Sequence, residues 1–221
     1  MNNVADVIAH RKIISAVHFT LLDNLYLILS TGFIKPRNKV DETLLLNLFN
    51  EVDLINTPDT KRFDGRTDCV NLSVSEPNYW LLQKYIDRTK KPLNEWVILY
   101  LKPCVLEIKG AVFCTSNAAS SVCSKKTGGD GFEALFSDEI VTKRGILKRK
   151  TTKHPNCPTD NQAEVLVPGD IPITNIQRIV VANDDVKSTL AASLNFITDI
   201  TAVPLTFIAM SSDLCVVDFL C

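Results

Sequence analysis

Residues 163–181, AEVLVPGDIPITNIQRIVV, constrain the fold more than any other part of the sequence. Two runs of apolar, mostly β-branched residues flank a turn marked by proline and glycine, which predicts two strands. A polar loop with a proline, CPTDNQ, precedes the first run, and a single acid, Glu164, stands inside that run. The fold must therefore hold a carboxylate at the start of an otherwise apolar strand.

The rest of the chain alternates between predicted strands and predicted helices, which gives an α+β class. A glycine, Gly32, closes a helix that begins near Asp23, as a glycine cap does. The other predicted elements are strands at 13–20, 69–74, 95–103 and 110–114, helices at 76–89 and 185–197, an amphipathic segment at 41–56, and an edge strand at 214–220. Residues 124–156 are poor in apolar residues, so we expect a long loop there.

Composition indicates one globular domain spanning residues 1–221, because 46% of the 221 residues are apolar. The 24 basic and 25 acidic residues nearly cancel, so only a local cluster can attract a polyanion. Seven scattered cysteines without a CxxC pair indicate reduced thiols and no metal site. The N-terminus lacks a signal-peptide pattern, and the apolar segment 200–210 is shorter than the roughly 20 residues that cross a bilayer. We therefore expect a cytoplasmic protein without a membrane partner.

Several enzyme classes lose support because their motifs are missing from the sequence. It contains no GxxxxGK[ST], no GxGxxG after a strand, no HExxH and no GxSxG. These absences weigh against P-loop kinases, Rossmann dehydrogenases, zinc proteases and serine hydrolases. The cysteine and histidine spacing does not single out a nucleophile and its base.

Gln162 and Glu164 lie two positions apart, so on a strand both side chains would face the same side. A carboxylate at a cleft could stabilise a developing positive charge, whereas a solvated acid at a strand start would need no function. His18 and Thr20 share a face in the same way and offer an imidazole and a hydroxyl to a polar ligand. A structural histidine is the alternative, and Asn24 could simply cap the following helix.

Two groups of cations could bind phosphate. Arg62 and Arg66 flank a loop, where a guanidinium can hold a phosphate with two hydrogen bonds or can be an exposed turn residue. A second group precedes the Glu164 strand and has no acid among its members, which are Lys143, Arg144, Lys148, Arg149, Lys150 and Lys153. This basic run could attract a polyanion or form a solvated face.

The order of several segments resembles the DarT family of nucleic-acid ADP-ribosyltransferases. They are HFTLLDNLYLILSTGFI, KRFDGRTDCVNLSVSEPNY, EWVILYLKPCVL, FCTSNAA and PTDNQAEVLVPGDIPITNIQRIVV, so the resemblance covers about residues 13–182. It implies an ADP-ribosyltransferase fold with a split, strongly bent β-core that holds NAD as a substrate. ADP-ribose would then be transferred to a base of single-stranded DNA or RNA.

The resemblance also implies roles for individual residues. Glu164 matches the catalytic glutamate, and Arg62 matches an arginine that contacts the NAD phosphate and positions the reacting ribose. His18, Thr20 and Asn24 match cofactor-binding positions. Gln162, two residues before the glutamate, would contact the acceptor base, with the basic run as further substrate contact. Asn117, Ala118 and Ala119 match the NAA element, to which the sequence assigns no role.

This family resemblance leaves the acceptor open between DNA and RNA, because CVNLSVSEPNYW stands where thymidine-modifying members carry an aromatic-rich segment. It implies a toxin of a toxin–antitoxin or phage-defence system, with a neutralising partner such as a macrodomain. A protein-directed ADP-ribosyltransferase, an NAD glycohydrolase and a non-catalytic NAD-binding module are the alternatives.

Overall fold

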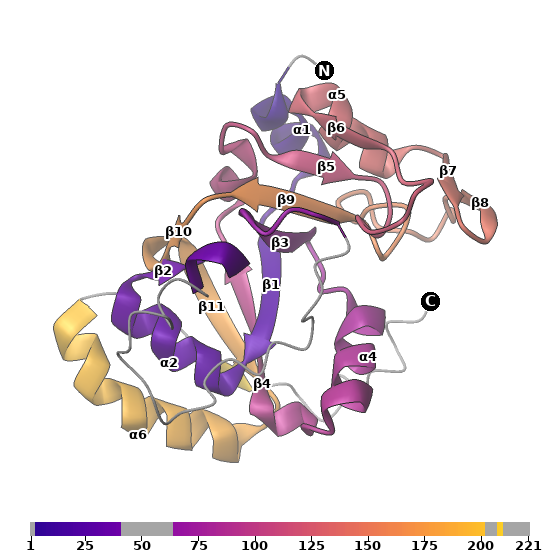
Figure 1. Ribbon diagram of the computed structural model, residues 1–221. Helices are drawn as coiled ribbons and strands as arrows, with labels where there is room; N and C mark the ends of the chain where they lie inside the picture. Colours follow the sequence, from indigo (N-terminus) through magenta and orange to yellow (C-terminus); the bar gives the residue numbers. More distant parts are fainter. Residues whose placement is uncertain (1–2, 41–63, 202–206, 210–221) are drawn as a thin grey trace.

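The computed structural model describes residues 3–40, 64–201 and 207–209. Its largest sheet has the strand order β12–β11–β4–β1–β3–β9–β5–β6 (Figure 1). Neighbouring strands run antiparallel, apart from the parallel pair β11 and β12. Their bounds are β1 Ala16–Leu21, β3 Cys69–Val74, β4 Trp96–Leu101, β5 Val112–Cys114, β6 Lys125–Thr127, β9 Glu164–Pro168, β11 Ile176–Val181 and β12 Phe207–Ala209.

Helices cover both faces of the lower half of this sheet (Figure 1). Alternation along β4 explains the two layers, since Leu99 packs in the core cluster with Leu25 and Leu29 of α2, whereas Ile98 packs with Leu82 of α4. The helices and short elements are α1 Val4–Arg11, α2 Leu22–Thr31, α4 Tyr79–Thr89, η1 Leu93–Glu95, η2 Pro103–Glu107, α5 Gly128–Glu133, η3 Ala134–Phe136, η4 Ile173–Asn175 and α6 Asp184–Thr201.

The large sheet splits between β1 and β3. These strands share only two paired positions, Ala16 with Val74 and Val17 with Ser73. Beyond this point β1 continues along β4, with six registered pairs, while β3 continues along β9. The two halves of the core therefore diverge and leave space between the C-terminal part of β1 and β3. This mixed architecture with a divided sheet confirms the predicted α+β class.

The strands and helices predicted from periodicity are largely present. The helix predicted from near Asp23 to Gly32 is α2, and Gly32 takes the left-handed conformation (φ 77°) that a glycine cap requires. The predicted strands correspond to β1, β3, β4, β5, β9 and β11, and the predicted helices 76–89 and 185–197 correspond to α4 and α6. The amphipathic segment 41–56 and the predicted edge strand 214–220 lie outside the described residues.

The prediction of a long loop at 124–156 is wrong. This segment contains β6, α5, η3 and the hairpin of β7 (Glu139–Thr142) and β8 (Gly145–Lys148). Its few apolar residues are well placed, because Phe132 is buried and stacks on Phe113 with ring centroids 4.6 Å apart. A side chain at Gly131 would come within 2.8 Å of the Lys126 backbone, so this helix needs a glycine there. Elsewhere, β2 (Phe33–Ile34) pairs with β10 (Ile171–Pro172).

Candidate active site in the split of the sheet

A pocket occupies the space where β1 and β3 part. It has a cavity volume of about 230 Å³ and takes its walls from β1, α2, β3 and α4. Three positions expected to bind the cofactor, His18, Thr20 and Asn24, line this pocket together with Glu164. The structure thus brings together residues up to 146 positions apart in sequence (18 to 164) at one cavity.

Glu164 is the first residue of β9 and is only 5% exposed. The side-chain amide of Asn117 donates to its Oε1 over 3.1 Å, and the backbone N–H of Ala118 donates to its Oε2 over 3.0 Å. A buried carboxylate is costly unless hydrogen bonds compensate for the lost water. Glu164 is therefore a buried, hydrogen-bonded acid at the pocket and not a solvated residue at a strand start.

His18 lies on β1, with its ring held by β3. Its Nδ1 is 3.0 Å from the main-chain oxygen of Asn71, and because a carbonyl only accepts, Nδ1 carries the proton. Burial lowers the pKa of His18, and the hydrogen bond to Asn71 opposes this shift. The ring is consequently neutral near pH 7, which leaves Nε2 as an acceptor on a residue that lines the pocket.

Thr20 and Asn24 form a connected pair at the junction of β1 and α2. The Asn24 amide donates to Thr20 Oγ1 over 2.9 Å, so Asn24 does not cap the helix, whose N-cap position is Leu21. Asn24 Oδ1 is buried and accepts no hydrogen bond from any described residue. Asn78, which also lines the pocket, has a buried Nδ2 that likewise donates to no described residue. These two atoms offer a ligand one acceptor and one donor.

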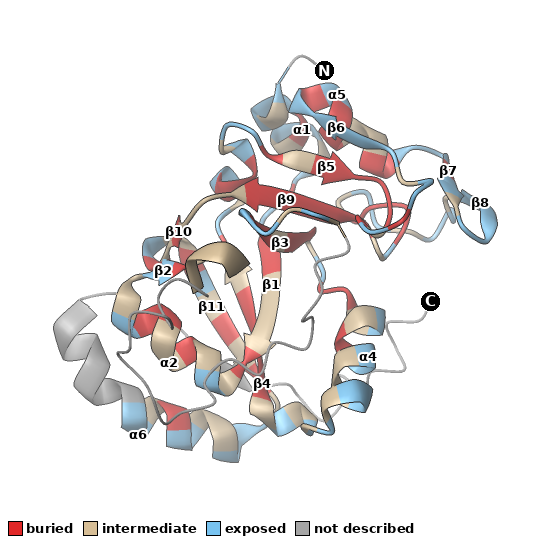
Figure 2. Ribbon diagram, viewed as in Figure 1, coloured by how far each residue is buried: buried red, intermediate tan, exposed pale blue. Residues whose placement is uncertain are grey.

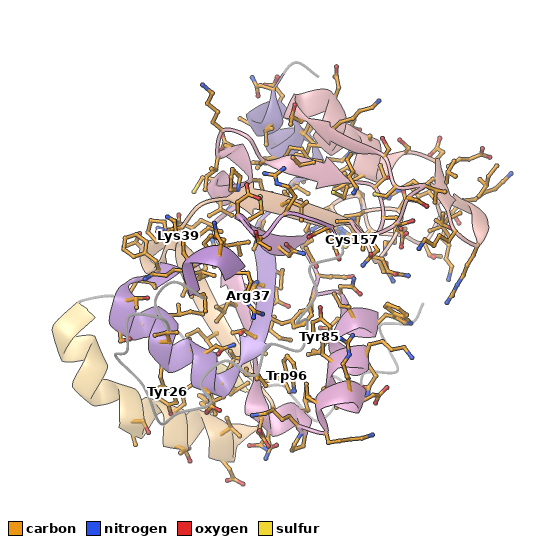
Figure 3. All side chains as sticks on the ribbon, viewed as in Figure 1. Tyr26, Arg37, Lys39, Tyr85, Trp96 and Cys157 are labelled. Carbon is orange, nitrogen blue, oxygen red and sulfur yellow. The ribbon has the colours of Figure 1, made fainter. Side chains whose placement is uncertain are left out.

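Aromatic side chains form one end of the pocket. Tyr85 of α4 and Trp96 of β4 stack with centroids 6.3 Å apart, and Phe19 meets each of them edge-on at 5.9 and 6.2 Å. Figure 3 labels Tyr85, Trp96 and Arg37 around the space beside β1, and all three line the pocket. The sequence reasoning did not single out these residues or Asn71 and Asn78. No sequence motif marks these residues. They are identified only by their position on strands and helices that border the split in the sheet.

Gln162 does not share a strand face with Glu164, which corrects the spacing argument. β9 begins only at Glu164, and Gln162 occupies a turn at residues 161–162. The buried Asp160 makes this turn, because its Oδ1 accepts the backbone N–H of Gln162 over 2.8 Å. Gln162 is half-buried and does not line the pocket.

The six cations of the basic run have different surroundings. The Arg149 guanidinium donates to the main-chain oxygens of Cys157 and His154 and to Thr159 Oγ1, over 2.9–3.0 Å. Lys148 forms an exposed ion pair with Glu139 over 3.3 Å, and Lys153 donates to Asn161. Lys143, Arg144 and Lys150 are exposed. The hairpin therefore displays charge, while Arg149 fastens its base to the segment that leads into β9.

Of the two loop arginines, Arg62 lies outside the described residues. Arg66 forms an ion pair with Asp68 over 2.8 Å and donates to Cys69 Sγ over 3.0 Å, contacts that suit a turn residue. Within residues 3–40, 64–201 and 207–209, no group of three or more His, Cys, Asp or Glu side chains is arranged to hold a metal ion. None of the helices described there is long and apolar enough to span a membrane.

Comparisons with known proteins agree with this geometry. Residues 17–206 match the family model described as "DarT: ssDNA thymidine ADP-ribosyltransferase". Thermus sp. 2.9 DarT, solved in complex with NAD⁺, superposes with a TM-score of 0.61 at 15% identity, covering 91% of this chain and 97% of that one. The same protein in complex with ADP-ribosylated ssDNA gives a TM-score of 0.58 at 15% identity, over 91% and 96% of the chains.

Thermosipho africanus DarTG in complex with ADP-ribose gives a TM-score of 0.54 at 16% identity, over 87% of this chain and 49% of that one. At these identities the structural likeness shows a shared fold. No curated protein matched the sequence.

Proposed function

Because the chain belongs to the DarT family of single-stranded-DNA thymidine ADP-ribosyltransferases, which use NAD, we propose that it transfers ADP-ribose from NAD to a thymine base of single-stranded DNA. The observation that supports this proposal most is the placement of Glu164. It is a buried carboxylate with both oxygens hydrogen-bonded, at a pocket that His18, Thr20 and Asn24 also line. We assign the chemistry to Glu164 and the binding of NAD to this pocket.

The reaction breaks the glycosidic bond between C1′ of the ribose and nicotinamide. The departing nicotinamide leaves an oxocarbenium-like ribose, and a nearby carboxylate stabilises that positive charge electrostatically. A ring nitrogen of thymine then bonds to C1′ and loses its proton. Since Glu164 is shielded from water, its negative charge would act on the transition state with little screening.

The remaining pocket residues suit the other parts of NAD. His18, Thr20 and Asn24 Oδ1, which accepts no hydrogen bond from the described residues, offer hydrogen bonds to ribose hydroxyls and to a carboxamide. The aromatic cluster of Phe19, Tyr85 and Trp96 offers apolar surface to a planar ring. We propose that Arg37 and, as the resemblance implies, Arg62 bind the pyrophosphate.

On the acceptor side, Gln162 and the exposed members of the basic run are our candidates for contact with DNA. A thymine ring nitrogen is paired and stacked in a duplex, which favours a single strand as substrate. The β7–β8 hairpin carries Lys143 and Arg144 at its exposed turn, where phosphates can reach them. RNA remains the second candidate, since the segment CVNLSVSEPNYW has aromatic residues only at its end, Tyr79 and Trp80, where thymidine-modifying members carry an aromatic-rich segment.

Labelled NAD distinguishes these acceptors directly. The purified protein is incubated with labelled NAD and, in separate reactions, with oligonucleotides of single base composition in DNA and RNA form, and with a protein pool. We expect label on oligo-dT, and a mass spectrum of the digested nucleosides should show ADP-ribosyl-thymidine. Label on RNA alone would move the acceptor to RNA, label on protein alone would reject the nucleic-acid proposal, and ADP-ribose release without any acceptor would indicate an NAD glycohydrolase.

We further propose that the protein acts as a toxin, in a toxin–antitoxin or phage-defence system. An enzyme that modifies thymine blocks templates in its own cell, so a partner such as a macrodomain must restrain or reverse it. Thermosipho africanus DarTG, which was solved in complex with ADP-ribose, is about twice as long as the part of it that matches this chain. Expression of the wild type and of Glu164→Gln from the same inducible plasmid tests this role, because only the active enzyme should stop growth.

A further inference from the structure

The segment between β5 and β6 contains the two residues that hold Glu164. We propose that Asn117 is a positioning residue for this carboxylate: its side-chain amide, together with the Ala118 N–H, fixes the orientation in which Glu164 meets the reacting ribose. This inference rests on the proposed role of Glu164. It assigns a purpose to the NAA element at residues 117–119, to which the sequence assigned none.

The two donors act on different oxygens of the carboxylate. Asn117 Nδ2 lies 3.1 Å from Oε1, and the Ala118 nitrogen lies 3.0 Å from Oε2. A carboxylate held at only one oxygen can still rotate about its terminal torsion, whose energy profile is broad. Holding both oxygens fixes the plane of the group as well as its place. Donors to a carboxylate also favour its charged form, which is the form that stabilises a developing cation.

The amide of Asn117 can present only its nitrogen to Glu164. Its Oδ1 accepts the backbone N–H of Ala119 over 3.0 Å, in a turn of the kind that asparagine and aspartate favour. Oxygen and nitrogen of an amide are distinguished by such networks, and here the N–H of Ala119 requires the oxygen on that side. Asn117 therefore performs two separable tasks, since Oδ1 shapes the loop and Nδ2 holds the acid.

The loop is braced well enough to act as a fixed support. Its ends are tied by the Thr115 N–H to Ser124 oxygen bond of 3.0 Å, and the Ser120 N–H donates to the Asn117 oxygen over 2.9 Å. Ala118 is fully buried, and β5 pairs with β9 so that Cys114 lies opposite Glu164. The donors thus lie in a braced loop that directly follows β5, the strand paired with the one that carries the acid, which keeps their relative positions constant.

Two substitutions at Asn117 separate its tasks. Asn117→Asp keeps an oxygen for the Ala119 N–H, and so keeps the loop turn, but replaces the donor by a second carboxylate beside Glu164. Asn117→Ala removes both contacts. If the donor matters, we expect kcat for nicotinamide release to fall about 100-fold in Asn117→Asp, as for the loss of a donor at a reacting centre. The KM for NAD should stay within about threefold, because the interaction matters mainly in the transition state.

Ser120→Ala is the matched control, because Ser120 is in the same loop and its buried hydroxyl makes no hydrogen bond to any described residue. We expect it to retain wild-type kcat. Asn117→Asp at the wild-type rate with an impaired Asn117→Ala would overturn the inference, since only loop shape would then matter. A raised KM with unchanged kcat in Asn117→Asp would also overturn it. Nicotinamide release can be measured without an acceptor. If the wild type cleaves NAD but leaves DNA unlabelled, the proposal that DNA is the acceptor is refuted, and the Asn117 variants still test the role of Asn117.

Discussion

The pocket beside Glu164 and the β7–β8 hairpin hold their charged side chains in opposite ways, one buried and the other exposed. At the pocket, one acid is buried, with donors on both oxygens, and the neighbouring strands β1, β3 and β9 are buried or half-buried along their length (Figure 2). On the hairpin, Lys143 and Arg144 are exposed, and so are the apolar Val141 and Ile146 beside them. Buried charge depends on fixed partners and little on salt, whereas exposed charge acts through the field that salt screens. Buried charge therefore suits a reaction at a single bond, and exposed charge suits the binding of a flexible polyanion.

The largest effect should come from the buried side of this comparison. We expect Glu164→Gln to lower the rate of ADP-ribosyl transfer by at least about 1,000-fold, because the amide keeps the size of the side chain but removes the charge that stabilises the ribose cation. NAD binding should change little. Isothermal titration with NAD and single-turnover transfer to oligo-dT measure the two quantities separately.

Glu107→Gln provides a matched control, because it makes the same chemical change at an exposed position away from the pocket. Its transfer rate should equal that of the wild type. If Glu164→Gln still transfers at a comparable rate, the carboxylate is not the group on which the reaction depends.

The next effect tests the exposed side. Neutralising Lys143, Arg144 and Lys150 together should weaken binding of single-stranded DNA by roughly 30- to 100-fold at low salt, because each phosphate contact releases a condensed counterion. The slope of log affinity against log salt should fall by about 2, since each contact on a single strand contributes about 0.7. Fluorescence anisotropy over a salt series measures both. NAD cleavage without DNA should be unchanged.

A second triple variant, with three lysines neutralised away from the hairpin, tests whether DNA binds to the hairpin or is attracted by the net charge of the protein. Lys102, Lys109 and Lys187 lie on other parts of the molecule, and their neutralisation should reduce affinity only slightly. Equal losses from the two triple variants would show that net charge, and not the hairpin, attracts DNA.

The fold was predictable where apolar periodicity was strong and failed where packing depended on a few residues. A continuous apolar run identified β4, and apolar residues at helical spacing identified α2. Residues 128–133, GGDGFE, have poor helix propensity and gave no such signal. They form α5 because Phe132 stacks on Phe113, a contact between residues 19 positions apart (113 to 132) that no local pattern reports.

Some residues of the candidate site were likewise predicted from the sequence, and others were missed. The family resemblance identified Glu164, His18, Thr20 and Asn24, and the structure places these four at one pocket. The spacing argument for Gln162 failed because Asp160 makes a turn, so the strand begins two residues later than the alternation suggested. Asn78 gave no sequence signal, since only the placement of α4 beside the split shows that its buried Nδ2 lines the pocket and donates to no described residue.

Arg149 lies between the two regions and should affect stability more than binding. Arg149→Met removes the hydrogen bonds to Cys157, Thr159 and His154, which we expect to lower the free energy of unfolding by about 2 kcal/mol. Urea denaturation measures this difference. The neighbouring Lys150→Met, at an exposed position, should change stability by less than about 0.5 kcal/mol. If Arg149→Met instead keeps the stability of the wild type and binds DNA weakly, Arg149 contributes to DNA binding, as the exposed cations do, and not to stability.

The smallest expected effect is the contribution of His18, a residue of the pocket, to the pH dependence of the free energy of unfolding. Burial lowers the pKa of His18 in the folded protein, so the unfolded chain binds the proton more readily. The stabilising contribution of the neutral ring is complete above the unfolded pKa of about 6.5 and is lost as the pH falls from there toward the folded pKa. Each pH unit in that window should cost less than about 1.4 kcal/mol.

His18→Gln cannot titrate, so its free energy of unfolding should fall less than that of the wild type between about pH 7.5 and pH 5.5. Parallel thermal and urea unfolding at these two pH values gives the difference. Raised salt should leave this difference nearly unchanged, because the shift arises mainly from burial, whereas the same salt should abolish most of the hairpin's contribution to DNA affinity. Equal pH dependence in the two proteins would mean that water reaches His18 freely. His18 would then not be shielded in the way that distinguishes the pocket from the exposed hairpin.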